Sequence, residues 1–143
     1  MEIKDIKKWF ETAIPEPTVE QACIQIGCHY EEVAEMAEAL YDSNLSEETN
    51  RVANQYKDVE KYYIASLDSL DAVEKIEILD SLCDQIVTAI GVAHMLGMDI
   101  ENALAEVNRS NHSKFEDGKP VFNAQGKISK GVNYTPPKLG KFI

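Results

Sequence analysis

Residues 71–98, DAVEKIEILDSLCDQIVTAIGVAHMLGM, constrain the fold more than any other stretch of this chain. Asp71 and Glu74 have the spacing of a capping box, and Gly97 suits a left-handed helix end, so the stretch predicts one long helix over residues 72–97. Its aliphatic side chains cover most of the helix circumference, which is typical of a helix buried on nearly all sides. We therefore expect the core to form around this helix.

One column of this helix is polar. Glu77, Asp80 and Asp84 recur at spacings of three and four residues, so they share a face with Thr88 and Gly91. An unpaired carboxylate inside an apolar element is strongly unfavourable or takes up a proton. The column therefore requires cations, which are either lysines and arginines or a metal.

The remaining periodicity predicts four more helices, over residues 3–12, 18–41, 46–70 and 99–114. Thr18 with Gln21 forms a capping box, Ser46 starts the third of the five predicted helices, and Asp99 caps the last. On the second, we expect Glu31 to point toward solvent and an apolar stripe to face inward, made of Ala22, Ile26, His29, Val33, Met36 and Leu40. The sequence thus predicts one all-α domain, an antiparallel bundle of four or five helices.

Residues 115–143 lack helical periodicity and predict an extended tail with a small hairpin around Gln125–Gly126. The chain has a net charge of -11, but residues 109–143 hold seven basic and two acidic side chains. The overall charge disfavours binding to duplex nucleic acid, whose phosphates favour lysine and arginine. An acidic body with a basic tail can hold metal and phosphate together.

The three cysteines, Cys23, Cys28 and Cys83, lie in apolar helical segments without CxxC spacing. They predict reduced, buried thiols and a cytoplasmic location. The amino terminus does not resemble a signal peptide, and the longest run without acids or lysines, 14 residues, is too short to span a bilayer. No membrane anchor is expected.

The acids also suggest a metal site made from two helices. Glu32 and Glu35 on one helix and Glu77 and Asp80 on another are each three residues apart, so crossing the helices brings two pairs together. Four carboxylates suit Mg²⁺, with Mn²⁺ as a substitute. The alternative is a solvated acidic face. The histidines lack the spacing of di-iron bundles, the cysteines lack zinc spacing, and no calcium-loop motif is present.

The segments HYEEVAEMAEAL and EILDSLCDQIVTAIGVAHMLGMD resemble the E-E-x-x-E and E-x-x-D motifs of the all-alpha nucleoside triphosphate pyrophosphohydrolases, the MazG-like superfamily. The tail, NRSNHSKFEDGKPVFNAQGKISKGVNYTPPKL, is similar to that of a phage and bacterial branch. The resemblance covers roughly residues 18–143. In one respect the chain departs from it, because 41 residues separate Glu35 from Glu77, more than is typical of the motif.

The resemblance implies hydrolysis of a nucleoside triphosphate between its alpha and beta phosphates, in nucleotide-pool housecleaning. Glu32, Glu35, Glu77 and Asp80 would bind magnesium, and Glu31 together with Glu32 would act on the attacking water. Asp84 would contact either a second ion or a lysine.

Substrate-binding candidates lie near the end of the last predicted helix and in the tail. Asn111 and Lys114 resemble the N-x-x-K end of that helix in this branch, and Asn108 belongs to the same polar cluster. Lys130 and Tyr134 would form a lid over the triphosphate. The alternative for Lys114 is a lysine favoured by the helix dipole. His29 is interpreted mainly as a core histidine, with contact to the base as the lesser alternative.

We expect a homodimer or a dimer of dimers, with residues 46–70 as an apolar surface to bury. Phosphoribosyl-ATP pyrophosphohydrolase activity is the alternative within the same superfamily. A non-catalytic helical adaptor, whose acids pair with lysines of a partner, is the alternative from another class.

Overall fold

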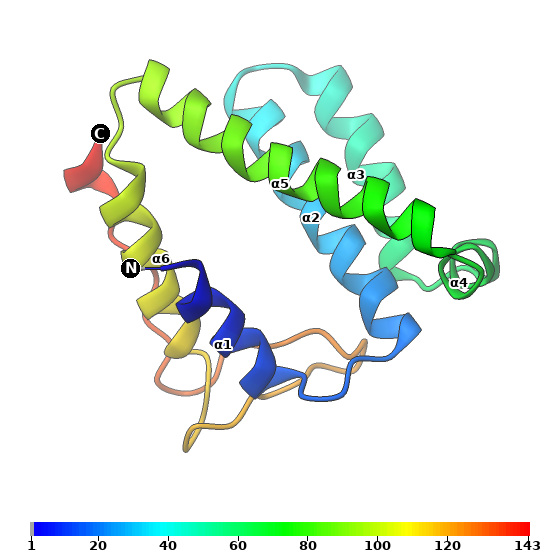
Figure 1. Cartoon of the computed structure of the whole chain (residues 1–143). Helices are drawn as coiled ribbons and strands as arrows, with labels where there is room; N and C mark the ends of the chain where they lie inside the picture. The colour runs from blue at the N-terminus through cyan, green and yellow to red at the C-terminus, as the bar shows by residue number, and fades with distance from the viewer. Residues whose placement is uncertain (1) are drawn as a thin grey trace. The chain divides into compact units, whose positions relative to one another are not determined.

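The computed structural model describes residues 2–143, which form six α-helices, one short 3-10 helix and no strand (Figure 1). The all-α prediction is confirmed, with more helices than the four or five expected. The helices are α1 (Ile3–Ala13), α2 (Val19–Ala39), α3 (Ser43–Lys57), α4 (Lys61–Asp68), α5 (Ala72–Met95), α6 (Ile100–His112) and the 3-10 helix η1 (Gly140–Phe142).

The single helix predicted over residues 46–70 is wrong, because this range contains two helices. Helix α3 begins at Ser43, since the Asp42 side chain accepts a hydrogen bond from the Leu45 N–H at 3.1 Å. It ends at Lys57, and Val59 then takes a φ of +56° before α4 starts. The left-handed backbone of this β-branched residue interrupts the helix. No proline or glycine at this position predicts the break from the sequence.

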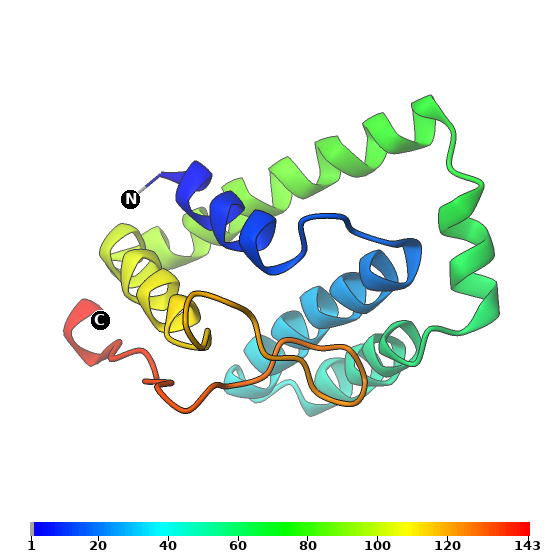
Figure 2. The same cartoon turned by 90° about the horizontal axis from the view of Figure 1, so that it is seen from below.

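The chain divides into two compact units, and each is described by itself. The first is Pro17–Asp71, in which α2 and α3 run side by side (Figures 1 and 2). Small side chains make this close approach possible. The buried residues are Cys23, Gly27, Ala34 and Ala37 of α2 with Ser46 and Ala53 of α3.

The packed face of α2 is therefore not the predicted apolar stripe. Met36 and Leu40, which were expected to point inward, are 50% and 62% exposed. The helices meet instead along the smallest side chains, because these let the two backbones approach closely. Glu31 lies beside this packed face and not toward solvent, which corrects a second expectation.

The second unit contains α1, α5, α6 and the tail. Its core stacks the Trp9 ring on the Phe115 ring, with centroids 5.4 Å apart and planes 13° apart, beside the buried Ala13. Ile14 and Ile128 pack against this cluster. The core thus joins α1 to the residues that follow α6.

Helix α5 ends as predicted, with Gly97 in the left-handed region at a φ of +76°. The Met98 N–H donates to the Ala93 carbonyl at 2.9 Å and the Gly97 N–H to the His94 carbonyl at 3.0 Å, a Schellman-type end. In the single chain, however, Ala93 is the one buried residue of α5 in the described structure. The unit that contains α5 therefore leaves most of this helix uncovered, because periodicity shows that a face needs cover but not what supplies it.

The three cysteine side chains also differ in their exposure. Cys23 is buried, Cys28 is half-buried and Cys83 on α5 is exposed, and all three are free. The prediction of buried thiols thus fails for Cys83. Among the described helices, none is both long and apolar enough to cross a membrane.

Candidate functional site

The two predicted carboxylate pairs belong to different units. Glu32 and Glu35 stand exposed on α2, and Glu77 and Asp80 stand exposed on α5. Both helices are continuous through these positions, so each pair shares one helical face as the spacing predicted. Among residues 2–143 no group of three or more histidine, cysteine, aspartate or glutamate side chains is arranged to hold a metal ion. The four-carboxylate site therefore stays a prediction.

The chemistry of these donors fits the ion that was predicted. Every candidate ligand is a carboxylate oxygen, and hard divalent cations such as Mg²⁺ take oxygen ligands. Asp84 continues the α5 column one turn beyond Asp80 and is exposed like the others. The Thr88 hydroxyl in the same column donates to the Asp84 carbonyl at 2.8 Å, so this bond leaves the Asp84 carboxylate unoccupied.

Glu31 has a cationic neighbour that sequence analysis missed. The Lys57 ammonium donates to a Glu31 carboxylate oxygen at 2.8 Å, and the two side chains are only 21% and 27% exposed. Gly27 makes room for this contact, since a Cβ there would lie 2.6 Å from Lys57 Cγ. The lysine comes from another helix, 26 residues away, so no local spacing could have identified the pair.

His29 is half-buried on α2, as expected for a packing residue. Its ring lies beside the Tyr30 ring, with centroids 6.2 Å apart, and Tyr30 in turn contacts Tyr56 of α3. The Tyr56 and Tyr63 rings stack with centroids 3.9 Å apart and join α4 to this cluster. Contact between His29 and a base stays a prediction.

The predicted substrate-binding residues near the end of α6 and in the tail lie in one unit. Asn108, Asn111 and Lys114 are half-buried, and no hydrogen bond or ion pair engages their side-chain ends within the described residues. The Gly131 N–H donates to the Lys114 carbonyl at 3.0 Å, which brings the tail back to the end of α6. A Cβ at Gly131 would lie 2.6 Å from that oxygen, so glycine is required at this crossing.

The two predicted lid residues contact each other. The Lys130 ammonium lies 4.8 Å from the centre of the Tyr134 ring, a cation–π contact. The predicted hairpin before them is also present, since Phe122 and Ile128 form a bridge and Gly126 is left-handed at a φ of +77°. A second tight turn at Asp117–Gly118, with both residues left-handed, was not predicted.

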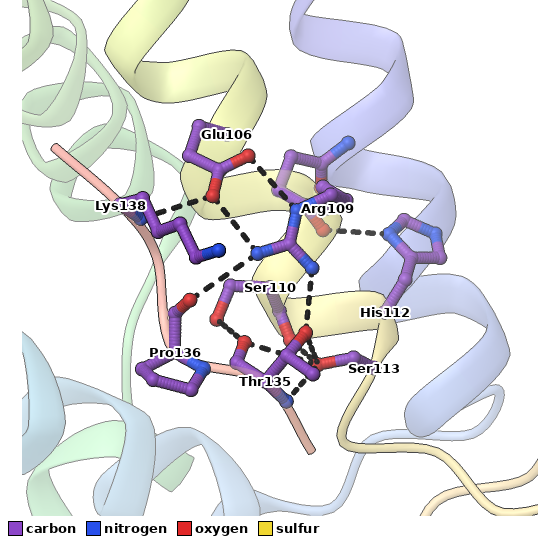
Figure 3. Close-up of polar contacts among 9 residues, drawn as sticks. Glu106, Arg109, Ser110, His112, Ser113, Thr135, Pro136 and Lys138 are labelled. Carbon is purple, nitrogen blue, oxygen red and sulfur yellow. Dashed lines mark hydrogen bonds and ion pairs between the residues drawn. The ribbon is translucent and has the colours of Figure 1, made fainter. Parts of the chain in front are cut away.

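A polar network fastens the last part of the tail to α6 (Figure 3). The Glu106 carboxylate accepts two hydrogen bonds from Arg109, at 2.8 and 2.9 Å, and one from the Lys138 N–H at 2.9 Å. Arg109 also donates to Thr135 Oγ1 at 2.7 Å, and the buried Ser110 hydroxyl donates to the Thr135 carbonyl at 2.8 Å. The extended segment is therefore held by side chains, not by a sheet.

The same network shifts an ionisation equilibrium. Hydrogen bonds from Arg109 and from the Lys138 backbone stabilise the charged form of Glu106 and lower its pKa from 4.5 to about 2. In return, Glu106 raises the pKa of Arg109 above its ordinary value. The ion pair between Glu106 and Arg109 is consequently fully charged at any pH near neutrality.

Comparison with family models, with curated proteins and with solved structures finds no significant match to this chain.

Proposed function

We propose that this chain is a magnesium-dependent nucleoside triphosphate pyrophosphohydrolase, which releases a nucleoside monophosphate and pyrophosphate in nucleotide-pool housecleaning. The observation that carries the proposal is the column on α5. Glu77, Asp80 and Asp84 share one helical face, and none of the ion pairs in the described residues includes them. Like charges three and four residues apart repel one another, and a divalent cation relieves that repulsion.

In this proposal Glu32, Glu35, Glu77 and Asp80 would be the magnesium ligands, as the resemblance implies. Bound magnesium would neutralise phosphate oxygens and acidify water, so the reaction requires no serine or cysteine nucleophile. Glu31 orients the attacking water. Lys57, 2.8 Å from its carboxylate, is a positioning residue that fixes the direction of that side chain.

The end of α6 and the tail would receive the triphosphate. Asn108 and Asn111 supply amide groups, and Lys114 and Lys130 supply positive charge. The cation–π contact holds the Lys130 ammonium against the Tyr134 ring. The proposal also includes a cytoplasmic location, suggested by the free thiols, and a homodimer or dimer of dimers.

The direct test is pyrophosphate release from a panel of ribo- and deoxyribonucleoside triphosphates with magnesium. Glu77→Gln should lower the rate by at least about 100-fold, because it removes a metal ligand. Glu101→Gln, an exposed acid at the start of α6, is the matched control and should keep full activity. Cleavage of phosphoribosyl-ATP alone would favour the related activity within the superfamily.

Magnesium-linked stability separates an enzyme from an adaptor. At 100 times its dissociation constant, a ligand stabilises the folded state by about 2.7 kcal/mol. For a chain of this length that corresponds to a rise in Tm of roughly 5–10 °C. The rise should disappear in Glu77→Gln. Absence of the rise in the unmodified chain would contradict the metal site and favour the adaptor.

A further inference from the structure

Residues 109–143 carry seven basic side chains, and the two acids among them, Glu116 and Asp117, are neighbours. A carboxylate close to a triphosphate repels it, so an acid at this end of α6 weakens binding unless it has another effect. The two acids differ in their surroundings. Asp117 is exposed in a tight turn, whereas Glu116 is half-buried and its side chain lies against the returning tail. Glu116 thus contacts the segment that carries Lys130.

The backbone of Glu116 is held from both directions. Its N–H donates to the Lys119 carbonyl, and its carbonyl accepts from the Lys119 N–H, each at 2.9 Å across the turn at Asp117–Gly118. The preceding residue, Phe115, is buried in the aromatic core against Trp9. A side chain on a backbone fixed in this way is a rigid support for whatever it binds.

The Glu116 side chain fixes the point at which the tail crosses the end of α6. Its Oε1 accepts a hydrogen bond from the Val132 N–H at 2.9 Å, and its Cγ would lie 2.8 Å from a Cβ at Gly131. The Gly131 N–H donates to the Lys114 carbonyl at 3.0 Å. Two successive amides of the tail are therefore bonded to residues 114 and 116, which sets both the position and the direction of the tail there.

We infer that Glu116 is a positioning residue, which keeps Lys130 beside Lys114 for the binding of a polyphosphate chain. Lys130 directly precedes the two bonded amides, so the position of its backbone depends on the crossing. Two lysines at a fixed separation contact neighbouring phosphates of one ligand with little further ordering of the chain, which favours binding. The inference rests on the proposed function, because it names the part of the substrate that this end of the site receives.

The sign of a mutational effect separates positioning from charge. Glu116→Ala and Asp117→Asn each remove one negative charge from the same turn, and asparagine suits the left-handed backbone of residue 117, where φ is +50°. Charge alone predicts that both substitutions tighten polyphosphate binding. Positioning predicts that Glu116→Ala weakens it about tenfold, the effect of losing one hydrogen bond to a charged group. Asp117→Asn should keep or improve the affinity. Glu116→Gln retains an acceptor oxygen and should stay within about threefold of the unmodified chain.

Isothermal titration calorimetry with inorganic tripolyphosphate, in the absence of magnesium, measures these affinities apart from catalysis. Hydrogen exchange reports on the contact itself. The Gly131 and Val132 amides should exchange faster in Glu116→Ala than in the unmodified chain or Glu116→Gln, with the helical circular dichroism unchanged. Equal or tighter tripolyphosphate binding by Glu116→Ala, or unchanged exchange at these two amides, would overturn the inference.

The enzyme assay distinguishes this inference from the proposed function. Glu116→Ala should raise the KM for the triphosphate about tenfold and change kcat by less than about threefold, because it alters binding and not the reacting groups. Pyrophosphate release with a KM that does not respond to Glu116→Ala would contradict only the inference. Tripolyphosphate binding that depends on Glu116, in a chain that cleaves no triphosphate, would contradict only the proposed catalysis. An unmodified chain that binds no tripolyphosphate would contradict both.

Discussion

Replacing Gly27 with alanine tests the close approach of α2 and α3. The added Cβ would lie 2.6 Å from the Ala53 carbonyl oxygen and 2.6 Å from Lys57 Cγ, and 3.0 Å from the Lys57 backbone nitrogen. The lysine side chain can move, but the two backbone atoms can retreat only if the helices separate. Overpacking of this kind costs about 1–3 kcal/mol. Alanine in a helix interior gains about 1 kcal/mol over glycine. With two backbone contacts the clash prevails, and we expect a net loss of about 1–2 kcal/mol.

Gly91→Ala is the matched control. Gly91 also lies inside a helix, α5, but a Cβ there meets no atom within 4 Å, so the propensity gain of about 1 kcal/mol is unopposed. Urea unfolding, followed by far-UV circular dichroism, should show a lower free energy of unfolding for Gly27→Ala than for the unmodified chain. The same measurement should show a higher free energy of unfolding for Gly91→Ala. If Gly27→Ala proves as stable as Gly91→Ala, the reasoning about the helix contact is refuted.

Two further substitutions address single side-chain contacts. Because hydrogen bonds hold the pKa of Glu106 near 2 instead of 4.5, this carboxylate stabilises the fold above about pH 4.5, and the contribution is lost as the pH falls toward 2. Between about pH 4.5 and pH 2 the Tm should therefore fall less for Glu106→Gln than for the unmodified chain or for Glu101→Gln. Lys57→Met should lower the free energy of unfolding by about 1 kcal/mol, since Glu31 loses its half-buried cation. In urea titrations, Lys61→Met, at an exposed lysine, should change the free energy of unfolding little. A loss equal to that of Lys57→Met would argue against the ion pair between Lys57 and Glu31.

The ends of the helices could be predicted because they depend on neighbours in the chain. Thr18 and Gln21 form the capping box that their spacing indicated, with hydrogen bonds of 3.2 and 2.9 Å. The Asp99 side chain caps α6 through the Asn102 N–H at 3.2 Å, and Gly97 ends α5 in the left-handed region. Each of these contacts joins residues within one or two helical turns, so the sequence alone carries the information.

The face that α2 packs could not be predicted in the same way. The spacing of apolar residues indicated Ile26, Val33 and Met36, whereas α2 packs Cys23, Gly27 and neighbouring alanines against α3. Hydrophobic periodicity weights large side chains, but closely packed helices select small ones. The choice depends on the surface of the other helix, which lies outside any local window of sequence.

The sequence by itself determined that the chain is helical, where most helices begin and end, and which acids share a face of α2 and α5. Those properties follow from contacts between residues a few positions apart. Only the tertiary structure decided that Lys57 holds Glu31, that Glu106 and Arg109 fasten the tail to α6, and that the unit containing α5 leaves most of this helix uncovered. These are contacts between segments that are not neighbours in the helical repeat, or the lack of such contacts within one unit, and periodicity does not encode which segments meet.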